Sequence, residues 1–280
     1  MVNSTKIFVV LNPKIMEQAA LTWGEKIALD LKKHRSDHAR LHVYCCIDDE
    51  ATSLRREEDL DEAATAAQRR VRQWIGRLVM HTRSLGIDLT IEVERNENWR
   101  SAMVAAVARN GSDVVIKNMT QHARLVRLLR DTADWRLLRD CRCPVMLVKT
   151  PQPYDIHKVL VAVKPSPDDV YEAANANILE AARSIAEDLG ADLHAVTCYK
   201  SDAPPDWQRF ADSCSLERQQ VTADIGVPEK VIAATASEID ADLVVIARVA
   251  RSESKSLLGD TARKVIDEVD TEVLVLPMSA

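Results

Sequence analysis

The chain has 280 residues, a formal net charge of −6, six cysteines and seven glycines. This length accommodates two domains of ordinary size. The charge includes no basic block, which argues against nucleic acid as a partner, and the cysteines are too sparse for the disulfide framework of a small secreted protein. Without a long uncharged apolar run or a signal-like start, we expect a cytoplasmic globular protein that crosses no membrane.

The first half of the chain alternates short apolar strands with amphipathic helices. Strands are expected at Ile7–Leu11, Leu41–Ile47, Ile87–Val93, Asp113–Lys117 and Pro144–Val148. Helical spacing runs from Met16 to Leu31 and over Ser53–Ser84, Trp99–Arg109 and Thr132–Asp140. This alternation predicts a parallel sheet covered on both faces.

The second half follows the same alternation. Strands are expected at Val159–Val163, Asp192–Cys198, Asp242–Ile246 and Val273–Leu276, with helices at Tyr171–Leu189, Pro228–Glu238 and Thr261–Val269. Between Tyr199 and Asp224 the pattern degenerates, where the first half has its long second helix. The aromatic side chains of Trp207 and Phe210 in that segment either fill the gap left by the missing helix or line a pocket, and we expect them to fill it.

Two stretches of sequence recur in the same order. Lys6-Ile-Phe-Val-Val-Leu-Asn-Pro13 returns as Lys158-Val-Leu-Val-Ala-Val-Lys-Pro165. Leu128-Leu-Arg-Asp-Thr-Ala133 returns as Leu257-Leu-Gly-Asp-Thr-Ala262. A repeat this long is a duplicated domain. We expect domains at residues 1–150 and 155–280, the second of them shortened between its second and third strands.

These residues resemble the universal stress protein family, in particular its tandem-domain E-type members, over essentially the whole chain. The most informative segments run from Asp113 to His122, from Thr132 to Leu138 and from Cys143 to Lys149. The resemblance implies two tandem doubly wound parallel five-stranded sheets of the adenine nucleotide alpha-hydrolase-like type, with strand order 3-2-1-4-5. It also implies that the two last strands adjoin antiparallel, as in a pseudo-dimer, and a further homodimer is compatible with it.

In family members that bind ATP, the loop after the fourth strand reads Gly-x-x-Gly, about nine residues, then Gly-Ser or Gly-Thr. An acidic residue ends the first strand. At the matching positions the second copy carries Lys164, Ala247, Ala250, Gly259 and Asp260. The loop also holds Arg248 and Arg251, which either bind an anion through their side chains or are solvated loop charges.

The first copy departs further from the ATP pattern. It carries Asn12 in place of the acid and Lys117, Thr120, Arg130 and Asp131 at the loop positions, and His122 is its best ligand-side candidate. Asp131 and Asp260 each precede a helical segment, where an N-cap carboxylate occupies the donors that a phosphate needs. We therefore expect no ATP in the first copy and weak anion binding, if any, in the second.

The remaining motifs support no catalysis. Cys141-x-Cys143 and Cys45-Cys46 have no second pair at zinc-like spacing, so buried thiols are expected and no metal. No serine stands in a nucleophile-elbow context. We expect a non-enzymatic stress-response binding or scaffold module with degenerate nucleotide motifs, no cofactor and an unnamed protein partner. The alternative is a nucleotide sensor or weak ATPase that holds ATP or AMP in the second copy.

Overall fold

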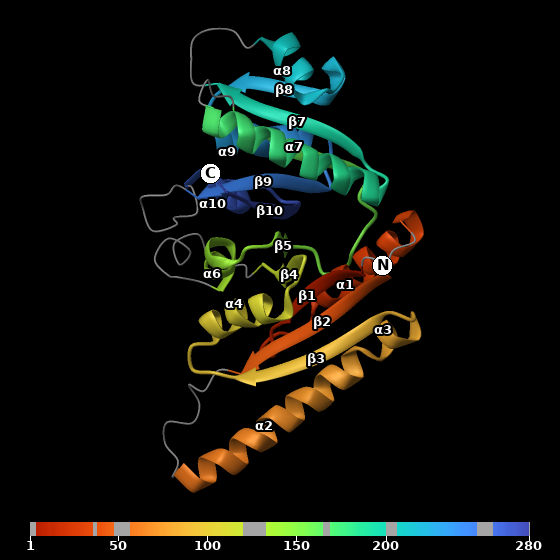
Figure 1. Ribbon diagram of the computed structural model, residues 1–280, viewed down its shortest axis with the longest axis vertical. Helices are drawn as coiled ribbons and strands as arrows, with labels where there is room; N and C mark the ends of the chain where they lie inside the picture. The colour runs from red at the N-terminus through yellow and green to blue at the C-terminus, as the bar shows by residue number, and fades with distance from the viewer. Residues whose placement is uncertain are drawn as a thin grey trace. The chain divides into compact units, whose positions relative to one another are not determined.

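The computed structural model describes residues 4–35, 38–47, 57–119, 133–164, 169–199, 206–250 and 260–279. The chain forms two compact units (Figure 1): unit 1 comprises residues 1–143 and 151–153, and unit 2 comprises residues 144–150 and 154–280. Segment 144–150, which the sequence assigns to the first copy, is grouped with unit 2 because its strand pairs with the last strand of the chain.

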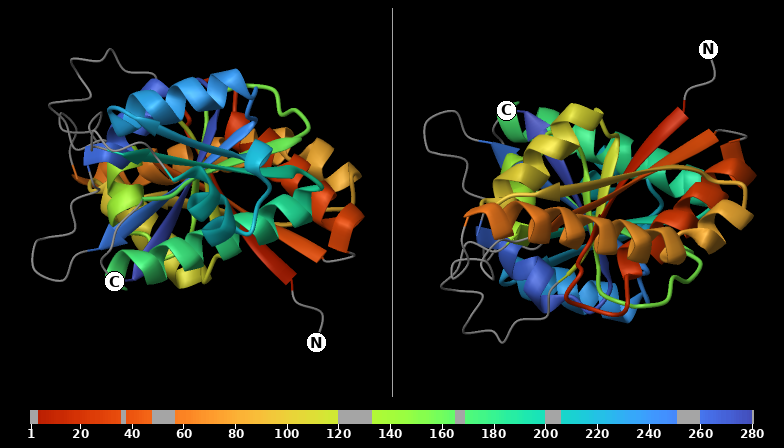
Figure 2. Two further views of the ribbon diagram at one scale, coloured as in Figure 1. Left: turned by 90° about the horizontal axis from the view of Figure 1, so that it is seen from above. Right: turned by 90° about the horizontal axis from the view of Figure 1, so that it is seen from below.

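The described part of unit 1 is built on four parallel strands in the order β3-β2-β1-β4. The strands are β1 (Ser4–Leu11), β2 (His38–Ile47), β3 (Asp88–Arg95) and β4 (Val114–Asn118). The helices are α1 (Ala19–Arg35), α2 (Glu57–Leu78), α3 (Met80–Ser84), α4 (Trp99–Asn110) and α6 (Ala133–Asp140). Right-handed crossovers place α1 and α2 on one face and α4 on the other. Helix α2 runs along β3, as Figure 1 and the right view of Figure 2 show.

The central strand β1 is packed from both sides. Ile7, Phe8 and Val9 are fully buried. On one side α1 approaches closely at Gly24, where an added Cβ would lie 2.8 Å from Cγ2 of Val9. On the other side the ring of Phe8 lies 5.1 Å from the ring of His42 on β2. A continuous apolar run therefore forms this strand because both of its faces are covered.

The described residues of unit 2 form six strands in the order β5-β10-β9-β6-β7-β8, with β5 antiparallel to β10 and the other pairs parallel. They are β5 (Val145–Val148), β6 (Lys158–Ala162), β7 (Asp192–Tyr199), β8 (Val221–Ile225), β9 (Leu243–Ala250) and β10 (Glu272–Ser279). Its helices are α7 (Asp169–Leu189), α8 (Trp207–Cys214), the 3₁₀ helix η1 (Arg218–Gln220), α9 (Pro228–Glu238) and α10 (Asp260–Glu268). In the left view of Figure 2, α7 and α9 lie on opposite sides of these strands.

The α/β class and the predicted pairing of the two last strands are confirmed. In the second copy the strands follow the order 3-2-1-4-5, and in unit 1 the first four strands follow 3-2-1-4. In the antiparallel pair, Met146 lies opposite Leu274. The carboxylate of Glu272, fully buried, accepts hydrogen bonds from the backbone N–H groups of Lys149 at 2.6 Å and Thr150 at 3.2 Å.

Two elements differ from the sequence-based expectation. The predicted helix over 53–84 is divided into α2 and α3 on either side of Val79, a residue that is fully buried. The segment between Tyr199 and Asp224, predicted to be degenerate, holds α8, η1 and the third strand β8. Phe210 is buried there and so fills the gap as expected, whereas the half-exposed ring of Trp207 lies 4.2 Å from the guanidinium of Arg218.

The duplication is also visible as a repeated set of bonds at the amino ends of the strands. In unit 1 the Asp113 carboxylate accepts from Lys6 N at 2.7 Å, and in unit 2 the Asp242 carboxylate accepts from Lys158 N at 2.9 Å. Each aspartate also donates its own N–H to the carbonyl of the same lysine. The two copies therefore share this tie between their first and fourth strands.

Candidate functional site

Ligands of open parallel sheets bind beyond the carboxyl ends of the strands, where the strand order reverses. In unit 1 this point lies at the ends of β1 and β4, and in unit 2 it lies at the ends of β6 and β9, both of which are paired neighbours. The predicted site residues Asn12 and Lys117 fall at the first point, and Lys164 and Ala247 at the second.

The residue after β1 is held by one carboxamide. Gln18, immediately before α1, donates from Nε2 to the carbonyl of Asn12 at 2.8 Å and accepts the N–H of Asn12 at 3.0 Å. The side chain of Asn12 turns back on its own loop and accepts the N–H of Lys14 at 2.9 Å. Both backbone polar groups of Asn12 are therefore used within the chain.

The second copy uses the same device with a different residue. Asn175, from α7, donates from Nδ2 to the carbonyl of Lys164 at 2.5 Å and accepts the N–H of Lys164 at 3.2 Å. Lys164 is the repeat partner of Asn12 and follows β6 as Asn12 follows β1. We call this arrangement the carboxamide clamp. Its sequence signal is a carboxamide in or next to the first helix of each copy, which the motif comparison overlooked.

Lys117, the residue at the first glycine position of the first copy, points into the protein. Its Nζ lies 2.5 Å from Oδ1 of Asp134 on α6, and the two side chains are only 8% and 9% exposed. Nζ also donates to the carbonyl of Asn118 at 2.9 Å. A charged pair occupies the place where the nucleotide-binding pattern has an open glycine backbone.

The side chain of Asn118 links the end of β4 to the start of α1. Its Oδ1 accepts the N–H of Ala20, in the first turn of α1, at 2.6 Å, and its Nδ2 donates to the carbonyl of Glu17 at 3.3 Å. A free N–H in the first turn of a helix is a donor that an anion can use. In this copy the donor is already taken by a side chain from the neighbouring strand.

The predicted fourth-strand loop of the second copy begins later than expected. Strand β9 continues to Ala250, and its last residues pair with β10, Ala247 opposite Leu276 and Arg248 opposite Pro277. Alanine at both glycine positions is compatible with this extended conformation. Asp260 is the first residue of α10. Arg251 and Gly259, like Thr120, His122, Arg130 and Asp131 of the first copy, lie outside the described residues.

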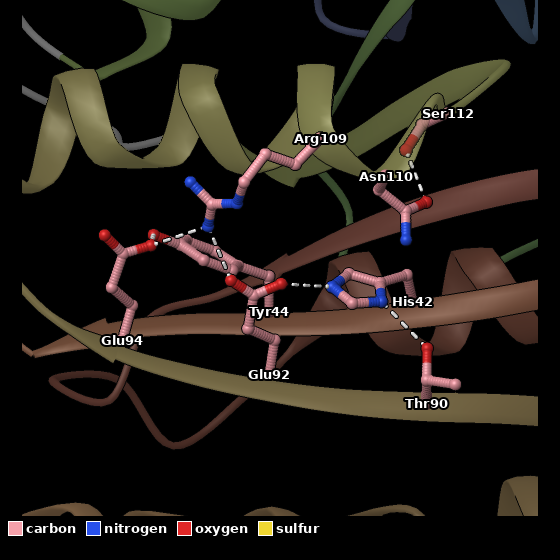
Figure 3. Close-up of polar contacts among 8 residues, drawn as sticks. All are labelled: His42, Tyr44, Thr90, Glu92, Glu94, Arg109, Asn110 and Ser112. Carbon is pink, nitrogen blue, oxygen red and sulfur yellow. Dashed lines mark hydrogen bonds and ion pairs between the residues drawn. The ribbon is translucent and has the colours of Figure 1, made fainter.

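A second polar cluster, which the sequence reasoning missed, lies on the face of the unit 1 sheet (Figure 3). Nδ1 of His42 lies 2.8 Å from the hydroxyl of Thr90, and Nε2 lies 2.9 Å from Oε2 of Glu92. Arg109 of α4 donates to Glu92 at 2.7 Å and to Glu94 at 3.1 Å, and these bonds raise the pKa of Arg109. The alternation of Thr90, Glu92 and Glu94 along β3 was the available signal.

This cluster fastens the last turn of α4 to the sheet. Tyr44 is fully buried and donates to Glu94 at 3.0 Å, and burial raises the pKa of Tyr44. The carboxylates of Glu92 and Glu94 thus meet donors of the same chain. The cluster lies on β2, β3 and α4, whereas the candidate site lies at the ends of β1 and β4.

No group of three histidine, cysteine, aspartate or glutamate side chains in the described ranges is arranged to hold a metal ion. No helix there is long and apolar enough to cross a membrane. At the described strand ends the structure shows hydrogen bonding by the carboxamides of Gln18, Asn118 and Asn175 and the charge pair of Lys117 and Asp134.

Comparison with known proteins decides the family. A model of the universal stress protein family matches residues 3–149 and 215–277, which together make up most of the chain. The chain belongs to the universal stress protein family. The predicted resemblance is thereby confirmed. The unmatched stretch between the two matches includes the first strand and first helix of the second copy, where Lys164 and Asn175 lie.

Two relatives match most of this chain. The universal stress protein E homolog of Haemophilus influenzae is 27% identical over 296 residues, 96% of each chain. Universal stress protein E of Escherichia coli K12 is 28% identical over 72% of each chain. A universal stress protein structure from Pseudomonas aeruginosa UCBPP-PA14 has a TM-score of 0.73 at 26% identity and covers 97% of this chain and 92% of that one.

A universal stress protein from Archaeoglobus fulgidus shares the fold at 16% identity, with a TM-score of 0.73 over 97% of this chain and 96% of that one. The α/β fold is therefore shared with a protein from a distant organism.

Proposed function

We propose that this universal stress protein is a non-enzymatic binding or scaffold module whose first copy holds no nucleotide. The observation that carries the proposal is that side chains of the chain itself already bond the backbone groups at the ends of β1 and β4 in unit 1. We call this the self-occupied switch point. There Gln18 binds both backbone groups of Asn12, and Asn118 takes the N–H of Ala20. Lys117 is buried against Asp134.

Phosphate binding at such a point needs free backbone N–H groups and a close approach to the chain. To admit a nucleotide, unit 1 would have to break the bond from Ala20 N to Asn118 and reopen the clamp on Asn12. Each buried donor or acceptor left without a partner costs about 1–3 kcal/mol. Opening several of these bonds would cost about 3–6 kcal/mol of the free energy of nucleotide binding. This cost lowers the affinity of unit 1 for a nucleotide by roughly two to four powers of ten.

The absence of enzymatic activity is the second part of the proposal. The described switch point of unit 1 gathers carboxamides and one lysine–aspartate pair. Acid–base or nucleophilic catalysis needs a positioned base within hydrogen-bond reach of the reacting group. At this point the Lys117 ammonium and the Asp134 carboxylate are engaged with each other, which favours a structural role. We propose that the protein works without a cofactor, through binding to a protein partner.

Nucleotide binding by the second copy is the competing function, and one observation favours it. Lys164 at the end of β6 is exposed, and Arg248 lies near the end of β9, the strand that pairs with β6. Two cations at adjacent strand ends suit a polyphosphate better than the carboxamides of unit 1 do. In this alternative the protein is a nucleotide sensor or a weak ATPase.

Calorimetric titration of the full chain with ATP, at fixed magnesium and salt, tests both functions. We expect no saturable heat and no release of inorganic phosphate above a protein-free control. Binding of one ATP per chain that is lost in Arg248→Ala would establish the alternative instead. A different outcome is ATP binding that survives Arg248→Ala and Lys164→Ala but is lost in Asn118→Ala. This outcome would place the nucleotide in unit 1 and overturn the proposal that the first copy holds none.

A further inference from the structure

Helix α2 is only partly covered by the sheet of unit 1. It lies along β3, the edge strand of the sheet in that unit, as Figure 1 and the right view of Figure 2 show. Ile75 of α2 is fully buried. Val71, Trp74 and Leu78 keep part of their surface exposed. Unit 1 therefore leaves an apolar margin along this helix.

The charges of α2 are separated along its length. Its first six positions, 57–62, hold five acidic residues and no basic one, and the rest of the helix holds four arginines and no acidic residue. These arginines are all exposed: Arg69, Arg70, Arg72 and Arg77. None of them has an acidic residue three or four positions away in α2, which is the spacing at which side chains of one helix pair. The structure shows no ion pair between these arginines and another described residue.

The helix macrodipole explains only part of this separation. Acidic residues near the start of a helix and basic residues near its end are favourable, but the effect falls off within the first and last turns. Arg69, Arg70 and Arg72 lie six to nine residues before the end of α2 at Leu78, and a turn has about 3.6 residues. A surface of opposite charge beside the helix would therefore stabilise these arginines further.

Arg70, Trp74 and Arg77 share one face of α2, because they are four and three residues apart. Ala67 extends this face toward the middle of the helix, where positions 63–67 read Ala-Ala-Thr-Ala-Ala. We call Ala67, Arg70, Trp74 and Arg77 the α2 face. Tryptophan and arginine are the residues that most often anchor protein interfaces, and small side chains let two helices approach closely.

We propose that the α2 face binds the α2 face of a second molecule of this chain, with the two helices antiparallel. A two-fold axis near Ala67 sets position 77 of one molecule opposite position 57 of the other, and position 74 opposite position 60, which is a leucine. The acidic turns of each helix then lie beside the arginines of its partner. A parallel pair would set acidic turns against acidic turns, and like charges across an interface are unfavourable. This association does not depend on the function proposed above.

Sedimentation velocity of the full chain, repeated over a range of concentrations at low salt, tests the association. We expect the sedimentation coefficient to rise with concentration from the monomer value to the dimer value. It should fall again when salt is added, because salt screens exposed charges. A coefficient that stays at the monomer value at every concentration would overturn the proposal.

Charge-reversed variants test the antiparallel arrangement. One variant makes α2 mainly acidic by Arg70→Glu, Arg72→Glu and Arg77→Glu. The other makes it mainly basic by Glu58→Arg, Asp61→Arg and Glu62→Arg. We expect each variant alone to associate at least about tenfold more weakly than wild type, and an equimolar mixture of the two to associate as wild type does. Wild-type association by either variant alone, or a mixture that stays monomeric although circular dichroism shows both variants folded, contradicts the proposal.

Two further variants separate the α2 face from net charge. Lys32 and Lys33 are exposed on α1 of the same unit, so Lys32→Glu with Lys33→Glu should leave the association unchanged. Trp74→Ala should weaken it by at least about tenfold, as truncation of an interface anchor does. If the lysine variant weakens the association as much as the arginine variant does, or if folded Trp74→Ala associates like wild type, the α2 face is not the interface.

Discussion

At the scale of single residues, Lys117 shows how a lost ligand site is stabilised. In the nucleotide-binding pattern this position is glycine, and its backbone faces the phosphates. Here a lysine side chain is buried beside Asp134 and bonds the carbonyl of Asn118. An ammonium placed there without a partner would be strongly destabilising. The substitution of the glycine is therefore structurally tied to the aspartate on α6.

We predict that Lys117→Met destabilises unit 1 by about 3–5 kcal/mol, because the buried Asp134 carboxylate loses its countercharge. The double variant Lys117→Met with Asp134→Leu should recover much of this loss, since an apolar pair replaces both charges. Urea unfolding of each single variant and of the double variant gives the coupling energy. The exposed pair of Arg40 and Asp88, 55% and 81% exposed, supplies the control, where Arg40→Met should cost less than about 1 kcal/mol.

Glu272 makes a pH-dependent contribution to the attachment of β5. Burial raises the pKa of this carboxyl above its ordinary value of 4.5. A raised pKa in the folded state means that the associated stability is fully present below about pH 4.5 and is lost as pH rises through the folded pKa. We predict that, as pH rises through the folded pKa, the free energy of unfolding of Glu272→Gln increases relative to that of wild type. The change is at most about 1.4 kcal/mol per pH unit.

Urea unfolding of wild type and Glu272→Gln from pH 4 to pH 8 measures this difference, and the exposed Glu238→Gln controls for the substitution itself. A difference that shrinks as pH rises would mean that the bonds from Lys149 and Thr150 favour the charged carboxylate more than burial opposes it.

At the scale of elements, the two copies agree at one end of their strands and diverge at the other. The bonds between Lys6 and Asp113 recur as those between Lys158 and Asp242, and they tie the first strand to the fourth. At the carboxyl ends both copies keep the carboxamide clamp. In the first copy the fourth strand ends at Lys117 and Asn118, whereas in the second copy the fourth strand, β9, continues to Ala250. The copies therefore share the tie at the amino ends and the clamp at the carboxyl ends, and they differ in the residues that follow the fourth strand.

Two helix glycines offer a matched test of close packing. At Gly24 of α1 an added Cβ would lie 2.8 Å from Cγ2 of Val9, whereas at Gly76 of α2 it would meet nothing within 4 Å. We predict that Gly24→Ala destabilises unit 1 by about 1–3 kcal/mol, since overpacking outweighs the better helix propensity. Gly76→Ala should instead stabilise it by about 0.5–1 kcal/mol. Thermal unfolding compares the two, and a stabilising Gly24→Ala would show that Val9 moves aside freely.

At the scale of the whole molecule, periodicity and the internal repeat were enough to predict the α/β class and the tandem copies, and the resemblance to the universal stress protein family implied the antiparallel pairing of the last strands. They failed where local signals are weak. The strand Val221–Ile225 is short and follows a segment without periodicity, and buried Val79 gives no sequence sign that the long helix is divided there. The switch-point bonds of Gln18, Asn118 and Asn175 join residues from different elements, and only the fold brings such residues together.

The grouping of β5 with unit 2 leads to the last prediction. All four residues of β5 are buried, and the strand pairs with β10 through Val145, Met146 and Leu147. A chain that ends at Thr150 keeps β5 and lacks β10, so it presents an apolar strand edge. Such edges pair with other chains. We expect the fragment 1–150 to self-associate, as measured by sedimentation velocity. Met146→Lys within this fragment should reduce the self-association, because a charge on the edge opposes pairing. If the fragment 1–150 sediments as a monomer, the free edge of β5 does not drive self-association.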